Sequence, residues 1–147
     1  MKEEYKNFAA EFAETIVAQD LQSAHAFLAP WLQAKMTQND LRAAIEDKLL
    51  EMNEIWEIDE LIYPADFTIR HNSSSLEFLR EKPSWREARN IAPEVTGENF
   101  RQWMVIQFLP DEADERVELD GWFDFWFILV EHEGEFRIGF FEIEDVD

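Results

Sequence analysis

Carboxylates set among aromatic residues are the chain's best candidates for chemistry. On an ideal strand, Trp122, Asp124 and Trp126 share one face because successive side chains alternate. A carboxylate between indole rings is partly desolvated, which disfavours its charged form and raises its pKa. Such a group can act as a general acid or as a polar group of a binding pocket. A purely structural role, as the partner of an indole N–H or a backbone group, explains the same pattern.

A buried Asp124 needs a donor, and the Tyr63 hydroxyl or an indole N–H would supply one. We expect one largely apolar pocket, and its predicted lining residues are Phe12, Trp31, Tyr63, Asp124 and Trp126.

Several other chemistries lack sequence support. The three histidines, His25, His71 and His132, are far apart and have no metal-ligand spacing, so we expect no metal. The four glycines form no phosphate-binding pattern, and no nucleophile elbow is present. No cofactor is therefore expected.

The net charge of the chain limits the kinds of partner that it can bind. Acids outnumber bases 33 to 13 in 147 residues, for a net charge of −20. Such a chain repels phosphate backbones and anionic lipid, so neither nucleic acid nor a membrane is an expected partner. A cationic protein is a possible partner, but the simpler explanation of the charge is that it keeps the domain soluble. Without cysteine, a signal-like segment or a long apolar run, the chain is expected to be cytoplasmic.

Three helices are predicted in the first third of the chain. The first carries an apolar stripe at spacings of three and four. Asp20 is a good N-cap for a second, shorter helix, which ends or bends at Pro30. Thr37 and Asp40 form an approximate capping box that opens the third helix. The stripe of the first helix consists of Tyr5, Phe8, Phe12 and Ile16.

Strands are predicted from Glu54 onward, where the apolar period changes. Residues 54–69 predict one or two strands, broken near Pro64. Later strands follow each other closely, with Glu133-Gly134 as the last turn, which favours an antiparallel meander. These later strands are Phe100–Leu109, Gly121–Val130 and Phe136–Ile143, with a further short strand expected at Arg116–Leu119.

A long polar loop is expected at about residues 71–99, inside a single domain of residues 1–147. It contains two prolines and two short segments that could form helical turns, Leu76–Arg80 and Trp85–Arg89. A loop of this length is functional or mobile. Basic residues gather in and beside it, although charge balance with neighbouring acids explains them as well.

The order of these elements resembles the nuclear transport factor 2-like superfamily, which has an α+β fold of three helices packed on a curved antiparallel sheet in the shape of a cone. The resemblance covers most of the chain and is weakest across residues 71–99. The segments that carry it are Phe8–Phe12, Gln19–Leu21, Ala26–Pro30, Thr37, Gly121–Val130, His132–Gly134 and Phe136–Gly139.

The resemblance implies either a small enzyme or a binding module, because the superfamily includes both. Its ketosteroid isomerases use a carboxylate base and two oxyanion donors, a tyrosine and a protonated aspartate. Here the tyrosine position is Phe12, which has no hydroxyl, while Asp66 and Asp124 match the base and the second donor only loosely. That mechanism is therefore disfavoured.

Both faces of the segment 122–130 are apolar, so one face must pack on the helices and the other needs a cover. The alternatives are the long loop, a ligand or a second subunit, and we expect a homodimer through this sheet. The favoured function is a non-catalytic binding or interaction module, with an apolar small molecule or a cationic protein as partner. The alternatives are an isomerase, lyase or hydrolase that uses pocket carboxylates, and an acidic inhibitor or immunity-type protein for a basic partner.

Overall fold

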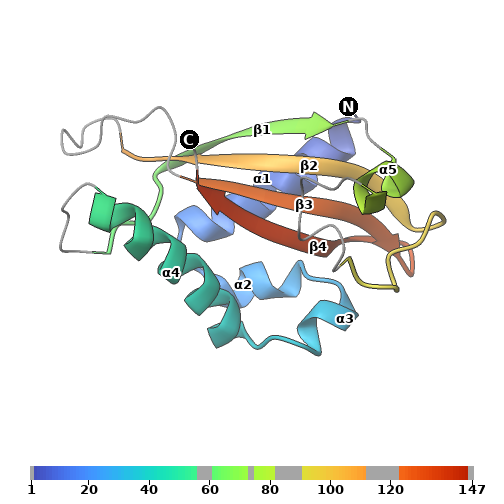
Figure 1. Cartoon of the computed structure of the whole chain (residues 1–147), viewed down its shortest axis with the longest axis horizontal. Coiled ribbons are helices and arrows are strands. Elements are labelled where there is room, and N and C mark those ends of the chain that lie inside the picture. The colour runs from blue at the N-terminus through green and yellow to red at the C-terminus, as the bar shows by residue number, and fades with distance from the viewer. Residues whose placement is uncertain (1, 56–60, 73–74, 82–90, 112–122, 146–147) are drawn as a thin grey trace.

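In the part of the chain that the structure describes, four helices precede a four-stranded antiparallel sheet, and a fifth helix follows the first strand of that sheet (Figure 1). The chain is seen in a computed structural model that describes residues 2–55, 61–72, 75–81, 91–111 and 123–145. The predicted helical turn at 85–89, the short strand at 116–119 and Trp122 lie outside these residues. The elements are α1 (Glu3–Val17), α2 (Leu21–Ala26), α3 (Pro30–Gln33), α4 (Gln38–Ile55), β1 (Asp66–Asn72), α5 (Leu76–Glu81), β2 (Phe100–Leu109), β3 (Phe123–His132) and β4 (Glu135–Asp145).

The predicted helix starts are confirmed at α2 and α4. The Asp20 carboxylate accepts the backbone N–H and the hydroxyl of Ser23 and so caps α2. Thr37 and Asp40 form a reciprocal capping box, in which each backbone N–H donates to the other's side chain. Pro30 does not end α2, which stops at Ala26, but begins α3, where its missing N–H leaves no hydrogen bond unmade.

The prediction of a strand from residue 54 is wrong at its start. Helix α4 continues through Ile55, and β1 begins only at Asp66. The buried stripe of Leu41, Ile45 and Leu49 holds α4 against the core. Glu54 and Ile55 continue this helix. A short alternating pattern cannot distinguish the end of a helix from the start of a strand.

The strands form the predicted antiparallel meander, in the order β1-β2-β3-β4. Phe125 pairs with Ile106 on one side and with Ile143 on the other. Glu133 and Gly134 link β3 to β4 with φ of 52° and 79°, a conformation that suits the tight turn of a hairpin.

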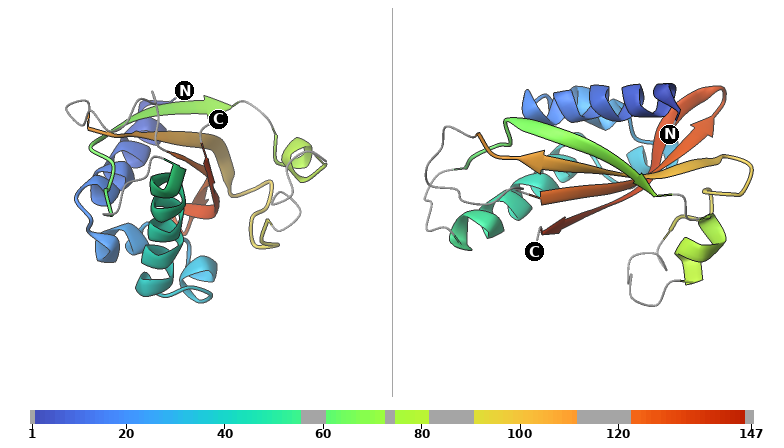
Figure 2. Two further views of the ribbon diagram at one scale, coloured as in Figure 1. Left: turned by 60° about the vertical axis from the view of Figure 1, so that its left-hand side comes forward. Right: turned by 90° about the horizontal axis from the view of Figure 1, so that it is seen from above.

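The two faces of the sheet pack against different elements. On one face, Phe123, Phe125 and Phe127 lie in the main core with residues of α1, α2 and α4. We call the opposite side, which carries Trp103, Asp124, Trp126 and Ile128, the tryptophan face. Helices α1 and α5 lie on opposite sides of the sheet (Figure 2).

The structure shows how each of these faces is covered. The face that carries Phe123, Phe125 and Phe127 packs on the helices within one chain, so it is not open to the second subunit expected on this sheet. The predicted helical turn at Leu76–Arg80 is confirmed as α5, and the segment expected as a long loop supplies a second core that covers one end of the tryptophan face. The buried residues of this second core are Leu76, Leu79, Ile91, Val95, Trp103, Ile128, Val130 and Phe140.

Candidate functional site

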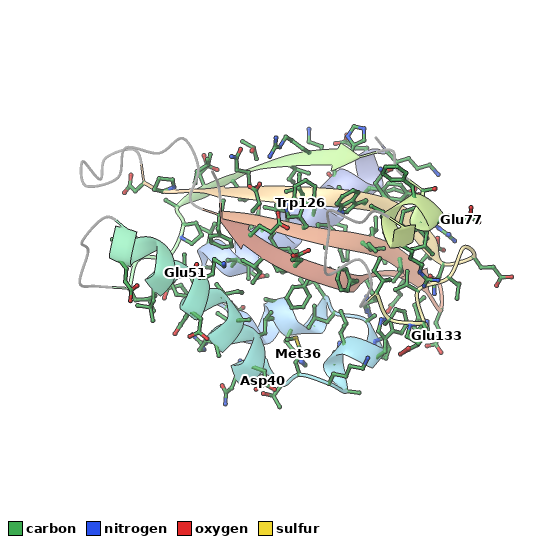
Figure 3. The ribbon with its side chains drawn as sticks, viewed as in Figure 1. Met36, Asp40, Glu51, Glu77, Trp126 and Glu133 are labelled. Atoms are coloured by element: carbon green, nitrogen blue, oxygen red, sulfur yellow. The ribbon has the colours of Figure 1, made fainter. Side chains whose placement is uncertain are left out.

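Asp124 lies on the tryptophan face, as its alternation with Trp126 predicts. Its side chain is only 14% exposed. One carboxylate oxygen, Oδ1, is buried, and no donor within the described part of the chain reaches it. The indole N–H of Trp126 is also buried without an acceptor among the described residues. Trp126 lies over the middle of the sheet (Figure 3), with its ring 5.0 Å from that of Trp103.

The electrostatics of Asp124 come from three sources. Burial raises the pKa of the Asp124 carboxyl, the nearby Arg70 guanidinium lowers this pKa, and the Glu144 carboxylate raises it. Arg70 is 3.8 Å from Oδ2 but is 57% exposed, so water screens its charge. Burial therefore outweighs the ion pair, and the net shift of the Asp124 pKa is upward.

Asp66 and Asp124 do not form a catalytic pair. They lie on the same face, but Asp66 pairs with Leu109 whereas Asp124 pairs with Gln107, so they are two strands and two residues apart. This offset corresponds to about 12 Å between their backbones. Asp66 is exposed, and its carboxylate accepts the N–H of Phe67 at 2.8 Å. A shared proton or substrate atom between the two carboxylates is not supported by this geometry.

The five predicted pocket residues do not line one cavity. Phe12 lies in the main core, with its ring 4.9 Å from Phe125, and the sheet separates it from Asp124 and Trp126. Trp31 packs on the second core and donates its indole N–H to the Gly139 carbonyl at 2.8 Å. Tyr63 donates to the Glu46 carboxylate of α4 at 2.7 Å, away from Asp124.

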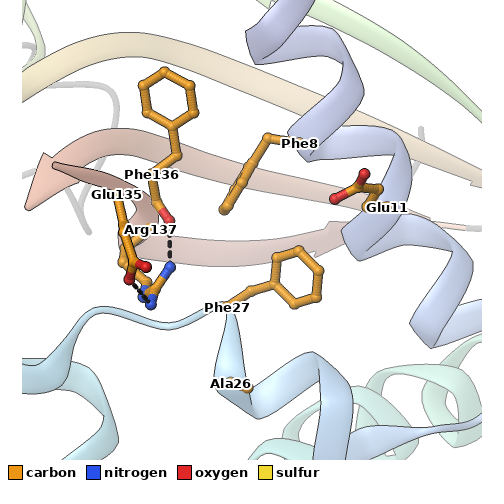
Figure 4. Close-up of a pocket in the computed structure, with 7 residues that line it drawn as sticks. All are labelled: Phe8, Glu11, Ala26, Phe27, Glu135, Phe136 and Arg137. Carbon is orange, nitrogen blue, oxygen red and sulfur yellow. Dashed lines mark hydrogen bonds and ion pairs between the residues drawn. The ribbon is translucent and has the colours of Figure 1, made fainter.

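A hollow is instead found where α1, α2 and the start of β4 meet (Figure 4). This groove has a volume of about 360 Å³. We call it the phenylalanine groove, because the rings of Phe8, Phe27 and Phe136 line it and are only partly buried. Phe8 contacts Phe27 edge to face at 5.3 Å and Phe136 at 6.3 Å. The other lining residues are Glu11, Ala26, Glu135 and Arg137.

Of the charged side chains at the rim of the phenylalanine groove, Arg137 and Glu135 pair with each other, whereas Glu11 has no such partner among the described residues. Arg137 forms an ion pair with Glu135 and donates to the Phe136 carbonyl at 2.8 Å. Its charge is therefore satisfied within the strand. Glu11 is exposed on α1, and no described cation pairs with its carboxylate. One uncompensated negative charge thus lies beside three aromatic rings.

A second groove of about 330 Å³ lies between α4 and β4. Its residues are Ala44, Lys48, Phe141, Glu142 and Ile143. Phe141 and Ile143 pack at the margin of the main core, while Lys48 and Glu142 supply charges of both signs. It therefore has fewer aromatic walls than the phenylalanine groove.

Comparisons do not assign the chain to a family: no family model, curated protein or solved structure matches it. Within the described residues, no group of three or more His, Asp or Glu side chains is placed to hold a metal ion. No helix in that part of the chain is both long and apolar enough to cross a bilayer.

Sequence reasoning missed the phenylalanine groove although it identified all three rings. Phe8 belongs to the predicted stripe of α1, while Phe27 and Phe136 stand in segments that mark the fold. Their meeting depends on the bridge between Leu28 and Ile138, where the Ala29 N–H donates to the Ile138 carbonyl and the Ile138 N–H to the Phe27 carbonyl, each at 2.8 Å. No local sequence pattern predicts such a long-range bridge.

Proposed function

We propose that the chain is a non-catalytic interaction module that binds an apolar, positively charged segment of a partner protein in the phenylalanine groove. The observation that carries this proposal is the groove itself: three partly buried rings beside the unpaired carboxylate of Glu11. The occupant is a bulky apolar side chain followed by an arginine or lysine.

The size and chemistry of the groove support this occupant. A volume of about 360 Å³ lies at the low end of ligand pockets, which suits one or two side chains. Burying an apolar side chain against phenylalanine rings supplies affinity. A neighbouring cation would gain from Glu11 and from the ring faces. The net charge of −20 would steer a basic partner toward the molecule.

The enzyme alternative has less support. Its best observation is the raised pKa of Asp124, which suits a general acid. However, Asp66 lies too far away to act with it, and Phe12 lies in the main core. A desolvated carboxylate beside a tryptophan is also common in structural networks.

The test uses a synthetic peptide of alternating arginine and phenylalanine, with a glutamate–phenylalanine peptide as its charge-reversed counterpart. We expect the basic peptide to bind and the acidic one not to bind. Ala26→Trp fills the groove from α2 without a change of charge and should abolish binding. Glu11→Lys should weaken binding about tenfold, as expected for a close charge pair.

Glu14→Lys is the matched control, because it makes the same charge change on α1 outside the groove lining. Equal losses from Glu11→Lys and Glu14→Lys, with no effect of Ala26→Trp, would mean that the peptide senses only net charge. An apolar dye that the Ala26→Trp variant fails to bind would point to an apolar small molecule instead.

We also propose that the α+β fold is of the nuclear transport factor 2-like kind and that the protein acts in the cytoplasm. The fold proposal is supported by the helices before the meander and by the closing β3–β4 hairpin. The absence of cysteine is compatible with a reducing compartment. An experimental structure in which the sheet closes into a cone around a cavity would test the fold proposal.

A further inference from the structure

Strand β1 is an edge of the sheet with an unused side. Among the described elements, only β2 pairs with it, and no helix or strand lies beyond it (Figure 1). The N–H of Phe67 donates to the Asp66 carboxylate on the outer side at 2.8 Å, a local bond that a partner strand would replace. Since backbone groups of alternate residues point to the same side, those of Phe67, Ile69 and His71 face outward. Such an edge is a template for another strand.

The side chains of β1 are complementary to themselves. If two copies of β1 pair antiparallel about a two-fold axis at Thr68, Asp66 of one copy faces Arg70 of the other. Phe67 then faces Ile69, and Thr68 faces Thr68. Opposite charges, apolar pairs and threonine pairs are all favourable cross-strand neighbours. The backbone alternation also agrees, because Phe67 and Ile69 would form hydrogen-bonded pairs.

We propose that β1 joins two copies of this chain edge to edge, so that the two four-stranded sheets form one eight-stranded antiparallel sheet. The interface is isologous, and each half carries one Asp66–Arg70 pair. Phe67 and Ile69 are only partly buried in a single chain and would gain cover on the helix-bearing side. This inference does not depend on the proposed function, since the phenylalanine groove lies elsewhere.

Charge makes β1 a suitable place for self-association. Two molecules of net charge −20 repel each other over most of their surfaces. On β1 one acid, Asp66, and one base, Arg70, offset each other, and Arg70, although it lies 3.8 Å from the Asp124 carboxylate, is 57% exposed and able to reach a partner. The match also specifies the register. A shift of the axis by one residue in either direction sets Asp66 or Arg70 opposite Thr68.

The test is the mass in solution of the wild type and of two charge variants, measured by sedimentation equilibrium at micromolar concentration. The wild type should be a dimer. In Asp66→Arg each interface pair becomes arginine against arginine, and in Arg70→Asp it becomes aspartate against aspartate. Each variant alone should self-associate about tenfold more weakly or worse, because two like-charged pairs replace two opposite ones.

Mixing the two variants restores both opposite-charge pairs. Across the axis, the arginine introduced at position 66 of one copy faces the aspartate introduced at position 70 of the other, and the unchanged Arg70 faces the unchanged Asp66. The mixture should therefore form a heterodimer with the mass of the wild-type dimer. Arg42→Asp is the control, because it makes the same charge change as Arg70→Asp on α4, and it should remain dimeric. A monomeric wild type, or a mixture no more associated than its components, would overturn the proposal.

Discussion

The guanidinium of Arg70 on β1 lies 3.8 Å from the carboxylate of Asp124 on β3, so the pair spans the intervening strand β2. Arg70 is mostly in water, whereas Asp124 is mostly buried. The exposed partner keeps its hydration, but the buried one loses most of its own. The pair therefore stabilises the carboxylate less than burial destabilises it, and the pKa of Asp124 is raised.

Asp124→Asn should consequently stabilise the protein at neutral pH, by about 1 kcal/mol, which is the size of a typical single-site effect. With a folded-state pKa above the ordinary 3.8, the Asp124 carboxylate binds its proton more tightly in the folded chain. Ionisation therefore costs stability at neutral pH, and this cost disappears as the pH falls through the folded-state pKa. Urea unfolding of both proteins across the acidic range measures the difference. A less stable Asn variant at neutral pH would show that the Arg70 pair dominates.

Tyr63→Phe should cost about 1 kcal/mol at neutral pH, because it removes the hydrogen bond to Glu46. Burial and this hydrogen bond raise the pKa of Tyr63 well above its ordinary 10.0. The phenol's contribution to stability is thus complete below about pH 10 and is lost as the pH rises further, since only the unfolded chain ionises there. The difference between wild type and variant should shrink in that range. A constant difference would contradict the raised pKa.

Trp31→Phe and Trp126→Phe form a matched pair that separates hydrogen bonding from packing. Trp31 loses its bond to the Gly139 carbonyl, whereas the buried Trp126 N–H has no acceptor to lose among the described residues. Both side chains are partly buried beside the second core. We expect Trp31→Phe to be the more destabilising by about 1 kcal/mol in denaturant melts. Equal costs would mean that ring packing alone sets both values.

Much of the sheet could be predicted, because its strands are long and their turn is distinctive. The predicted Phe100–Leu109 coincides with β2, and the predicted Gly121–Val130 overlaps β3. What covers each face could not be predicted, since Phe125 and Trp126 are both apolar. The structure buries Phe125 under the helices and leaves Trp126 partly open.

The candidate site is harder to predict, because both faces of β3 are apolar and the sequence does not show which residues share a face with Asp124. Asp124 is placed as its alternation with Trp126 indicates, because strand alternation is local. The sequence predicts that Phe12 and Tyr63 line the same pocket as Asp124. In the structure the sheet separates Phe12 from Asp124, and the Tyr63 hydroxyl donates to Glu46 instead. Val95 also lies in a segment without a periodic signal, yet it is fully buried on the tryptophan face. Sparse apolar residues in an aperiodic segment do not reveal their partners.

Gly139 tests how closely β4 approaches its neighbours. It is the extra residue at the register shift where Ile128 pairs with Phe140 and Leu129 with Ile138. A Cβ atom there would lie 2.7 Å from Val130 Cγ1 and 3.1 Å from Val95 Cγ2. Gly139→Ala should therefore cost about 1–3 kcal/mol through overpacking. Gly97→Ala, with no atom within 4 Å of the added Cβ, should stay within about 0.5 kcal/mol.

Val130→Ala shows whether the clash is the cause. Alone, it removes buried methyl groups and should destabilise the protein by about 1–2 kcal/mol. In the Gly139→Ala background it removes the atom that the new Cβ would strike, so the double variant should be more stable than the sum of the single costs predicts. Thermal or urea unfolding of the four proteins gives this coupling energy. If the costs simply add, the loss in Gly139→Ala comes from the backbone at the bulge and not from contact with Val130.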